Sequence, residues 1–152
     1  MPTLTSPAAT FQPRSRTLRN LPTAVAFPLA VVVGALGTTV IAAIAHGAGV
    51  SRSFSPLHPG SYVALIVLGV LGGAAAWQLV RVKARQPSRV LRSLVPAVVI
   101  LSFIPDIVIG ITGSFHATWG GVIALMAAHV VVAMAAVTSF AALLPADGSS
   151  GD

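Results

Sequence analysis

Four long apolar segments constrain the fold of this chain more than any other feature of its sequence. A helix rises about 1.5 Å per residue, so about 20 residues cross the roughly 30 Å hydrocarbon core of a bilayer. Within the four segments, Asp106 is the only residue among Asp, Glu, Lys and Arg. The sequence therefore predicts an all-α integral membrane protein, a four-helix bundle. The predicted spans are residues 24–45, 62–80, 94–111 and 119–144.

The composition excludes other classes of protein. Charged residues make up 8% of the chain, against about a quarter of an ordinary soluble domain. The net charge of +6 does not indicate a nucleic-acid partner. Most of the basic residues flank the apolar segments, so membrane topology explains them. The chain contains no cysteine, which excludes disulfides, thiolate metal sites and thiol redox chemistry.

Polar tails enclose the predicted transmembrane domain of residues 24–144. Residues 1–23 are rich in proline and residues 145–152 in glycine and serine, so we expect both tails to be disordered. The N-terminal tail and the 81–93 loop hold eight of the nine lysines and arginines. By the positive-inside rule, this asymmetry predicts cytoplasmic N- and C-termini and insertion into the inner (cytoplasmic) membrane.

The first apolar segment has two interpretations. The stretch Ala43-Ile44-Ala45 resembles a signal-peptidase site, and arginines precede the segment. However, the segment has 22 residues, whereas the apolar region of a signal peptide has about 7–15. We therefore expect a retained membrane anchor rather than a cleaved signal peptide.

A basic stretch separates the second and third spans. We expect it to fix the topology and to contact anionic lipid headgroups, so that the lipid bilayer is the main partner. Its cationic residues are Arg81, Lys83, Arg85, Arg89 and Arg92.

Small residues recur at four-residue spacing within the spans, which places them on single helix faces. Examples are Gly34 in the first span, Gly69 and Gly73 in the second, and Gly120 in the fourth. Such faces let helix backbones approach closely in lipid. They indicate either packing inside one bundle or a surface for a homo-oligomer, and the sequence leaves both open.

Asp106 and His129 are the ionisable residues placed deep in the apolar segments. Ionisable groups at this depth are costly and usually face a bundle interior or a cavity. At about 1.5 Å per residue, Asp106 lies about 10 Å and His129 about 15 Å from the outer ends of their helices. A short loop joins these two spans, so we expect the side chains to meet. Ser102 lies one turn from Asp106 and is predicted to share its face.

This intramembrane pair has two functional interpretations. It forms either a proton relay or ligand-binding site, or a structural latch that locks the helix hairpin. A third alternative places Asp106 near the interface, in contact with water. Pro105 removes a backbone donor beside Asp106, which favours a kink at this point.

No other catalytic or cofactor-binding pattern is present in the sequence. His46, His58 and His116 all map to the outer side, but their spacing matches no known ligand motif. A haem would need two axial ligands within the spans, and only His129 is deep enough. We therefore predict no metal, no cofactor and no catalytic residues.

Three stretches of the sequence carry a resemblance. They are GGAAAWQLVR at 72–81, LSFIPDI at 101–107 and LMAAHVVVAMAAV at 125–137. With them, the chain resembles an uncharacterised (domain-of-unknown-function) family of small four-span membrane proteins from high-GC Gram-positive bacteria. The resemblance covers residues 24–144 and places His129 on the family's histidine, whereas Asp106 falls on no position associated with the family. It implies the fold and the membrane location but no reaction.

These observations favour a non-enzymatic structural or interaction component of the membrane. The alternative is a small proton-coupled transporter or carrier that uses Asp106 and His129. A third alternative is a membrane enzyme acting on a lipid or a quinone.

Overall fold

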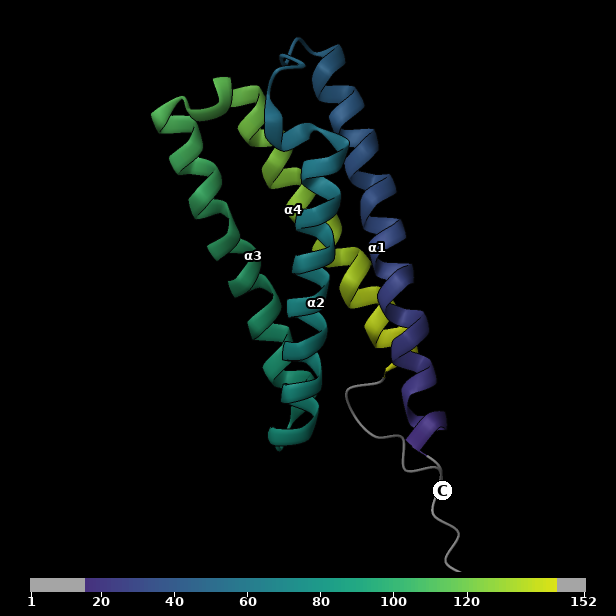
Figure 1. The fold of residues 1–152 in the computed structure, drawn as a ribbon. Helices are drawn as coiled ribbons and strands as arrows, with labels where there is room; N and C mark the ends of the chain where they lie inside the picture. Colours follow the sequence, from purple (N-terminus) through teal and green to yellow (C-terminus); the bar gives the residue numbers. More distant parts are fainter. Residues whose placement is uncertain (1–15, 145–152) are drawn as a thin grey trace, which may run out of the picture.

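The computed structural model describes residues 16–144 of the chain, with side chains described from Ala24 onward. Over these residues the chain is helical, without β-strands, and its long helices form a bundle (Figure 1). This confirms the all-α fold that the sequence predicts. In chain order the elements are α1 (Arg16–Gly47), η1 (Ser55–Leu57), α2 (Pro59–Lys83), α3 (Pro87–Thr112), η2 (Ser114–His116) and α4 (Trp119–Leu143).

Local sequence signals set the helix boundaries. Pro59 and Pro87 each occupy the first position of a helix, where the missing N–H would have had no partner in the helix. Gly113 ends α3 in the left-handed conformation, with φ of 64°, which a glycine adopts without a steric penalty. The Thr118 side chain caps α4 by accepting a hydrogen bond from the Gly121 N–H at 3.3 Å.

The first helix starts earlier than the sequence analysis predicts. Residues 16–23, for which the sequence predicts disorder, are helical and continue directly into the first span. Adding residues to an existing helix costs much less than nucleating a new one, so the flanking polar residues extend the helix of the span. The remaining residues assigned to tails, 1–15 and 145–152, lie outside the described part of the chain.

Four helices among the described residues are long and apolar enough to cross a membrane, so the protein is a membrane protein. The described apolar part of α1, Ala24–Gly47, includes the predicted span of residues 24–45. The predicted spans 62–80 and 94–111 lie inside the longer helices α2 and α3. The additional residues at the helix ends are mostly polar or basic.

The α4 helix is the centre of the bundle and contacts each of the other three long helices (Figure 1). Its closest partner is α1, where a Cβ atom on Gly34 would lie 3.4 Å from Cγ2 of Val132. The α3 helix is the peripheral one, because Leu91 and Asp106 are the only buried residues among its 26 residues, all of which are described. It lies on the opposite side of α4 from α1.

Two groups of buried apolar side chains hold the described part of the bundle together. One extends along α2 to the first turns of α3 and includes Ile66, Trp77, Leu91 and Phe140. The other lies toward the η1 end and includes Leu125 and Phe54. Phe54 comes from the α1–α2 loop and is completely buried, so the loop folds back onto the helices.

Candidate functional site

The structure brings together Asp106 of α3 and His129 of α4. Oδ2 of Asp106 lies 3.0 Å from Nδ1 of His129. The Asp106 side chain is almost fully buried, with 6% of its surface exposed, whereas 38% of the His129 side chain is exposed. The carboxyl group therefore faces the bundle, and the imidazole lies at the edge of the helix pair.

Helix geometry explains this encounter. A Cβ atom on Gly110 would lie 2.9 Å from Cγ2 of Val122, so α3 and α4 approach closely near the turn that joins them. Asp106 lies one helical turn below Gly110, and His129 lies two turns below Val122. Side chains lean toward the N-terminus of their own helix, and these helices are antiparallel. The two side chains thus lean toward each other and cover the difference in height.

Nδ1 of His129 has two neighbouring acceptors at equal distance. One is Oδ2 of Asp106, and the other is the Leu125 carbonyl oxygen, also at 3.0 Å. The direction of an N–H on Nδ1 suits the carbonyl, so Oδ2 has a close contact but no aligned hydrogen-bond donor among the described residues. A ring nitrogen carries one hydrogen and cannot serve both acceptors fully.

This arrangement permits two distributions of the proton. In one form, an imidazolium with hydrogens on both ring nitrogens donates its Nδ1–H to the Leu125 carbonyl and lies against an ionised Asp106. In the other, a protonated Asp106 donates to Nδ1 of a neutral imidazole whose hydrogen is on Nε2. The two forms differ by the position of one proton over a 3.0 Å gap. The site can therefore either hold the helices together or transfer a proton.

Ser102 does not join this pair. Its hydroxyl donates a hydrogen bond of 2.7 Å to the Val99 carbonyl oxygen within α3. A serine inside a helix often forms such a bond to its own backbone, and this bond uses the donor that we expected near Asp106. The prediction that Ser102 belongs to the site has no support in this geometry.

Thr38 is a buried polar residue whose role the sequence analysis did not identify. It is 2% exposed, and its hydroxyl oxygen has no hydrogen-bond partner among the described residues. It lies one turn beyond Gly34, on the α1 face that packs against α4. Its four-residue spacing from Gly34 was the available signal, but that spacing indicates close packing and not an unpartnered hydroxyl.

The glycines selected from the sequence have different surroundings. Gly34 faces Val132, Gly120 faces Val50 at 3.3 Å and Gly73 faces Phe140 at 3.9 Å, measured from a Cβ atom built on each glycine. Gly69, in contrast, has no neighbouring atom within 4 Å. It therefore makes no close helix contact within the described chain, which differs from the expectation for packing inside the bundle.

The closest contacts involve glycines that the sequence analysis did not select. A Cβ atom on Gly37 would overlap the Val131 side chain, and one on Gly121 would lie 2.9 Å from Cε1 of Phe54. Their partners, Val131 and Phe54, belong to other elements of the fold. Residue spacing within one helix therefore cannot reveal these contacts. Only the tertiary structure shows which glycines the packing requires.

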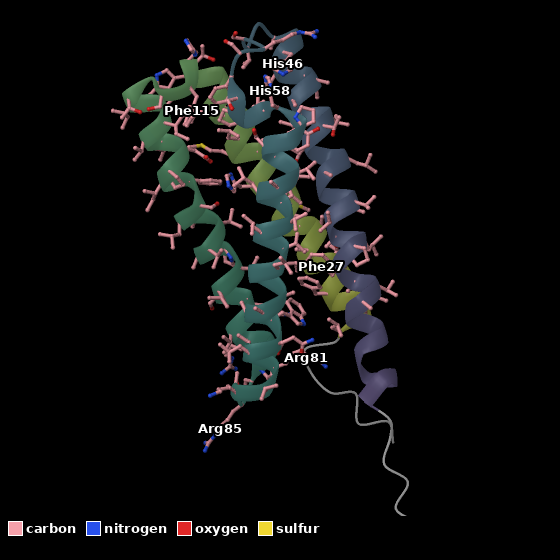
Figure 2. All side chains as sticks on the ribbon, in the orientation of Figure 1. Phe27, His46, His58, Arg81, Arg85 and Phe115 are labelled. Carbon is pink, nitrogen blue, oxygen red and sulfur yellow. The ribbon has the colours of Figure 1, made fainter. Side chains whose placement is uncertain are left out.

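Two of the outer histidines, His46 and His58, contact backbone carbonyl groups of the α1–α2 loop. Nδ1 of His46 lies 3.0 Å from the Val50 carbonyl oxygen, and Nε2 of His58 lies 2.6 Å from the Arg52 carbonyl oxygen. Figure 2 shows both histidines at one end of the bundle and Arg81 and Arg85 at the other. Among the described residues, no three side chains of His, Cys, Asp or Glu are grouped closely enough to hold a metal ion.

Residues 19–145 match a family of unknown function, DUF6069. The chain belongs to this family. The match covers most of α1 and all of the other helices, including both members of the Asp106–His129 pair. Comparison with curated proteins and with solved structures finds no match. The family confirms the predicted resemblance to an uncharacterised group of proteins and assigns no activity to the site.

Proposed function

We propose that this protein is a non-enzymatic structural or interaction component of a bacterial cytoplasmic membrane, with both termini in the cytoplasm. In this proposal the Asp106–His129 pair is a latch that holds the peripheral helix α3 against α4. The 3.0 Å contact between a buried carboxyl group and an imidazole on the neighbouring helix is the observation that supports it.

The burial pattern of α3 supports a latch. Leu91 lies near the start of this fully described helix, and Asp106 lies fifteen residues further on; its other residues are partly or fully exposed. Lipid tails are as apolar as these exposed side chains, so the side chains pack about equally well against lipid and against a neighbouring helix. A polar contact in the second half of α3 therefore supplies a specific attachment that the apolar surface lacks.

The expected strength of this latch is modest. Polar contacts between helices in membranes contribute about 0.6 kcal/mol on average and up to about 1.7 kcal/mol. Removing His129 costs more than this, at about 1–3 kcal/mol, because it leaves the buried carboxyl group of Asp106 unsatisfied. Either amount is enough to change how firmly α3 is attached.

The arrangement of the proton also favours a second candidate, a small proton-coupled carrier. Nδ1 of His129 has two acceptors at 3.0 Å, and the imidazole is partly exposed while the carboxyl group is not. A proton can therefore reach the exposed ring and pass to the buried oxygen. In this alternative Asp106 is the carrier and His129 is its partner.

Two variants separate the candidates. The full-length protein is purified as wild type, Asp106→Asn and His129→Ala, with His116→Asn as a control in the exposed α3–α4 turn. Asparagine is chosen because His116 has a φ of 59°, a conformation that asparagine tolerates. Each protein is unfolded by heat in detergent. It is also reconstituted into liposomes that contain a pH-sensitive dye, and proton uptake is measured under an imposed pH gradient.

The latch predicts that both site variants unfold at lower temperature than the wild type, while the control does not. It also predicts that wild-type liposomes take up protons no faster than protein-free ones. Unchanged unfolding of both site variants would contradict the latch. Wild-type proton uptake above that of empty liposomes, lost in both variants, would establish the carrier instead.

A further inference from the structure

The α2–α3 turn gathers five cations that have no protein partner among the described residues. These are the side chains of the basic stretch from Arg81 to Arg92, and none forms a hydrogen bond or ion pair with another described residue. Asp106 is the only acidic residue in the described part of the chain, and it lies fourteen residues beyond Arg92. The positive charge at this turn is therefore available to an external anion.

Two adjoining grooves lie on the first turns of α3, and they share Arg89. One, of about 400 Å³, is lined by polar and basic residues: Arg85, Gln86, Ser88, Arg89 and Arg92. The other, of about 440 Å³, is lined by Arg89, Val90, Ser93 and Leu94. A cationic groove thus continues into one with two apolar side chains.

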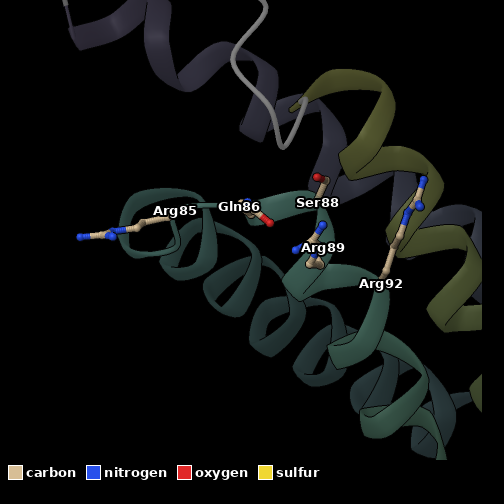
Figure 3. Close-up of a pocket in the computed structure, with 5 residues that line it drawn as sticks. All are labelled: Arg85, Gln86, Ser88, Arg89 and Arg92. Atoms are coloured by element: carbon tan, nitrogen blue, oxygen red, sulfur yellow. The ribbon is translucent and has the colours of Figure 1, made fainter.

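Three polar side chains of the first groove project from α3 toward one side. Figure 3 shows Ser88, Arg89 and Arg92 on this side, whereas Arg85 extends away along the turn. Arg89 and Arg92 are three residues apart, a spacing that places them on one helix face. Two guanidinium groups and a hydroxyl suit a phosphate group, because guanidinium binds phosphate through paired N–H donors.

The position of the grooves along α3 matches a membrane interface. The apolar segment 94–111 begins two residues beyond Arg92, so both arginines lie where the helix leaves the hydrocarbon core. Leu94 lies five residues beyond Arg89, roughly 8 Å deeper along the helix. Leu94 of the second groove is also deeper than Arg92, so this groove extends toward the level of the lipid acyl chains.

We propose that the first turns of α3 bind an anionic phospholipid, with its phosphate at Arg89, Arg92 and Ser88 and its acyl chain along Val90 and Leu94. This inference is independent of the Asp106–His129 latch and goes beyond the proposed function. A free phosphate has the same chemistry as the headgroup but no apolar part that could occupy the second groove. The combination of the two grooves therefore favours the lipid.

Binding is measured on the purified full-length protein in detergent by titration with phosphatidylglycerol and, separately, with zwitterionic phosphatidylcholine. The bound lipid is counted by native mass spectrometry. The test variant is Arg89→Gln/Arg92→Gln. The matched control is Arg81→Gln/Lys83→Gln, which removes the same charge at the same end of the bundle, from residues that do not line the grooves. Purified protein is used so that altered membrane insertion does not affect the result.

We expect phosphatidylglycerol to bind more tightly than phosphatidylcholine. Each interfacial arginine contributes about fivefold in affinity, so the test variant should lose on the order of 30-fold, and the control several times less. Equal losses in the two variants would show diffuse charge attraction and overturn the site. Equal binding of the two lipids by the wild type would do the same.

Soluble competitors separate a lipid from a free anion. Glycerol phosphate and inorganic phosphate, each in millimolar excess, should displace little bound phosphatidylglycerol, because neither fills the groove beside Val90 and Leu94. Complete displacement by inorganic phosphate at concentrations comparable to those of the lipid would assign the site to a free phosphate and overturn the lipid proposal.

Discussion

Nδ1 of His129 lies 3.0 Å from Oδ2 of Asp106 and at the same distance from the carbonyl oxygen of Leu125, four residues earlier in its own helix. The imidazole therefore links the backbone of α4 to the carboxyl group of α3. This link lies in the second half of α3, beyond the residues that pack at the start of the helix.

A double-mutant cycle measures the strength of this link. We expect Asp106→Leu and His129→Leu to couple by about 1 kcal/mol, because each side chain is the nearest polar side-chain partner of the other. Each free energy of unfolding is measured in mixed detergent micelles with a denaturing detergent. Strictly additive effects of the two substitutions would show that the contact contributes nothing to stability.

Gly37 and Gly69 are predicted to respond differently to the same substitution. A Cβ atom on Gly37 would overlap the Val131 side chain, whereas Gly69 has no atom within 4 Å of that position. Gly37→Ala should therefore destabilise the protein by about 1–3 kcal/mol through overpacking. Gly69→Ala should be neutral or stabilising, because alanine favours helix more than glycine does. Thermal unfolding in detergent compares the two, and a larger loss at Gly69 would contradict the observed packing.

Phe54 is predicted to anchor the α1–α2 loop. It is fully buried, and its ring occupies the space left by the missing side chain of Gly121. Phe54→Ala should cost about 3–5 kcal/mol and should make the loop more sensitive to limited proteolysis. Phe115→Ala is the control, because Phe115 is 56% exposed in the other loop at the same end. Similar proteolysis of the two variants would argue against an anchoring role.

Trp77 is predicted to stabilise the end of α4 through its indole. Its Nε1–H donates a hydrogen bond of 3.1 Å to the Leu144 carbonyl oxygen, which ends the described part of the chain. Trp77→Phe removes this donor but keeps a ring near Phe140, and it should cost about 1 kcal/mol. Trp119→Phe, at a residue that is 60% exposed, is the control. Both variants are compared by thermal unfolding, and an equal effect would rule out a specific role for the hydrogen bond.

The proximity of Asp106 and His129 could be predicted from the sequence. Counting residues from a short loop places two side chains at similar depth when the helices on either side are antiparallel. The same arithmetic does not show which backbone or side-chain atom a polar group selects. Ser102 therefore bonds to the Val99 carbonyl instead of joining the pair.

The sequence by itself determined the number of membrane-length helices in the described chain and the approximate positions of their apolar parts. Hydrocarbon thickness and helix rise fix these, and they need no knowledge of neighbouring helices. Which face of each helix turns inward was decided only by the tertiary structure. In water, a polar surface marks the outside of a helix. In lipid, both faces are apolar, so Gly37 and Gly69 have similar sequence environments and opposite structural ones.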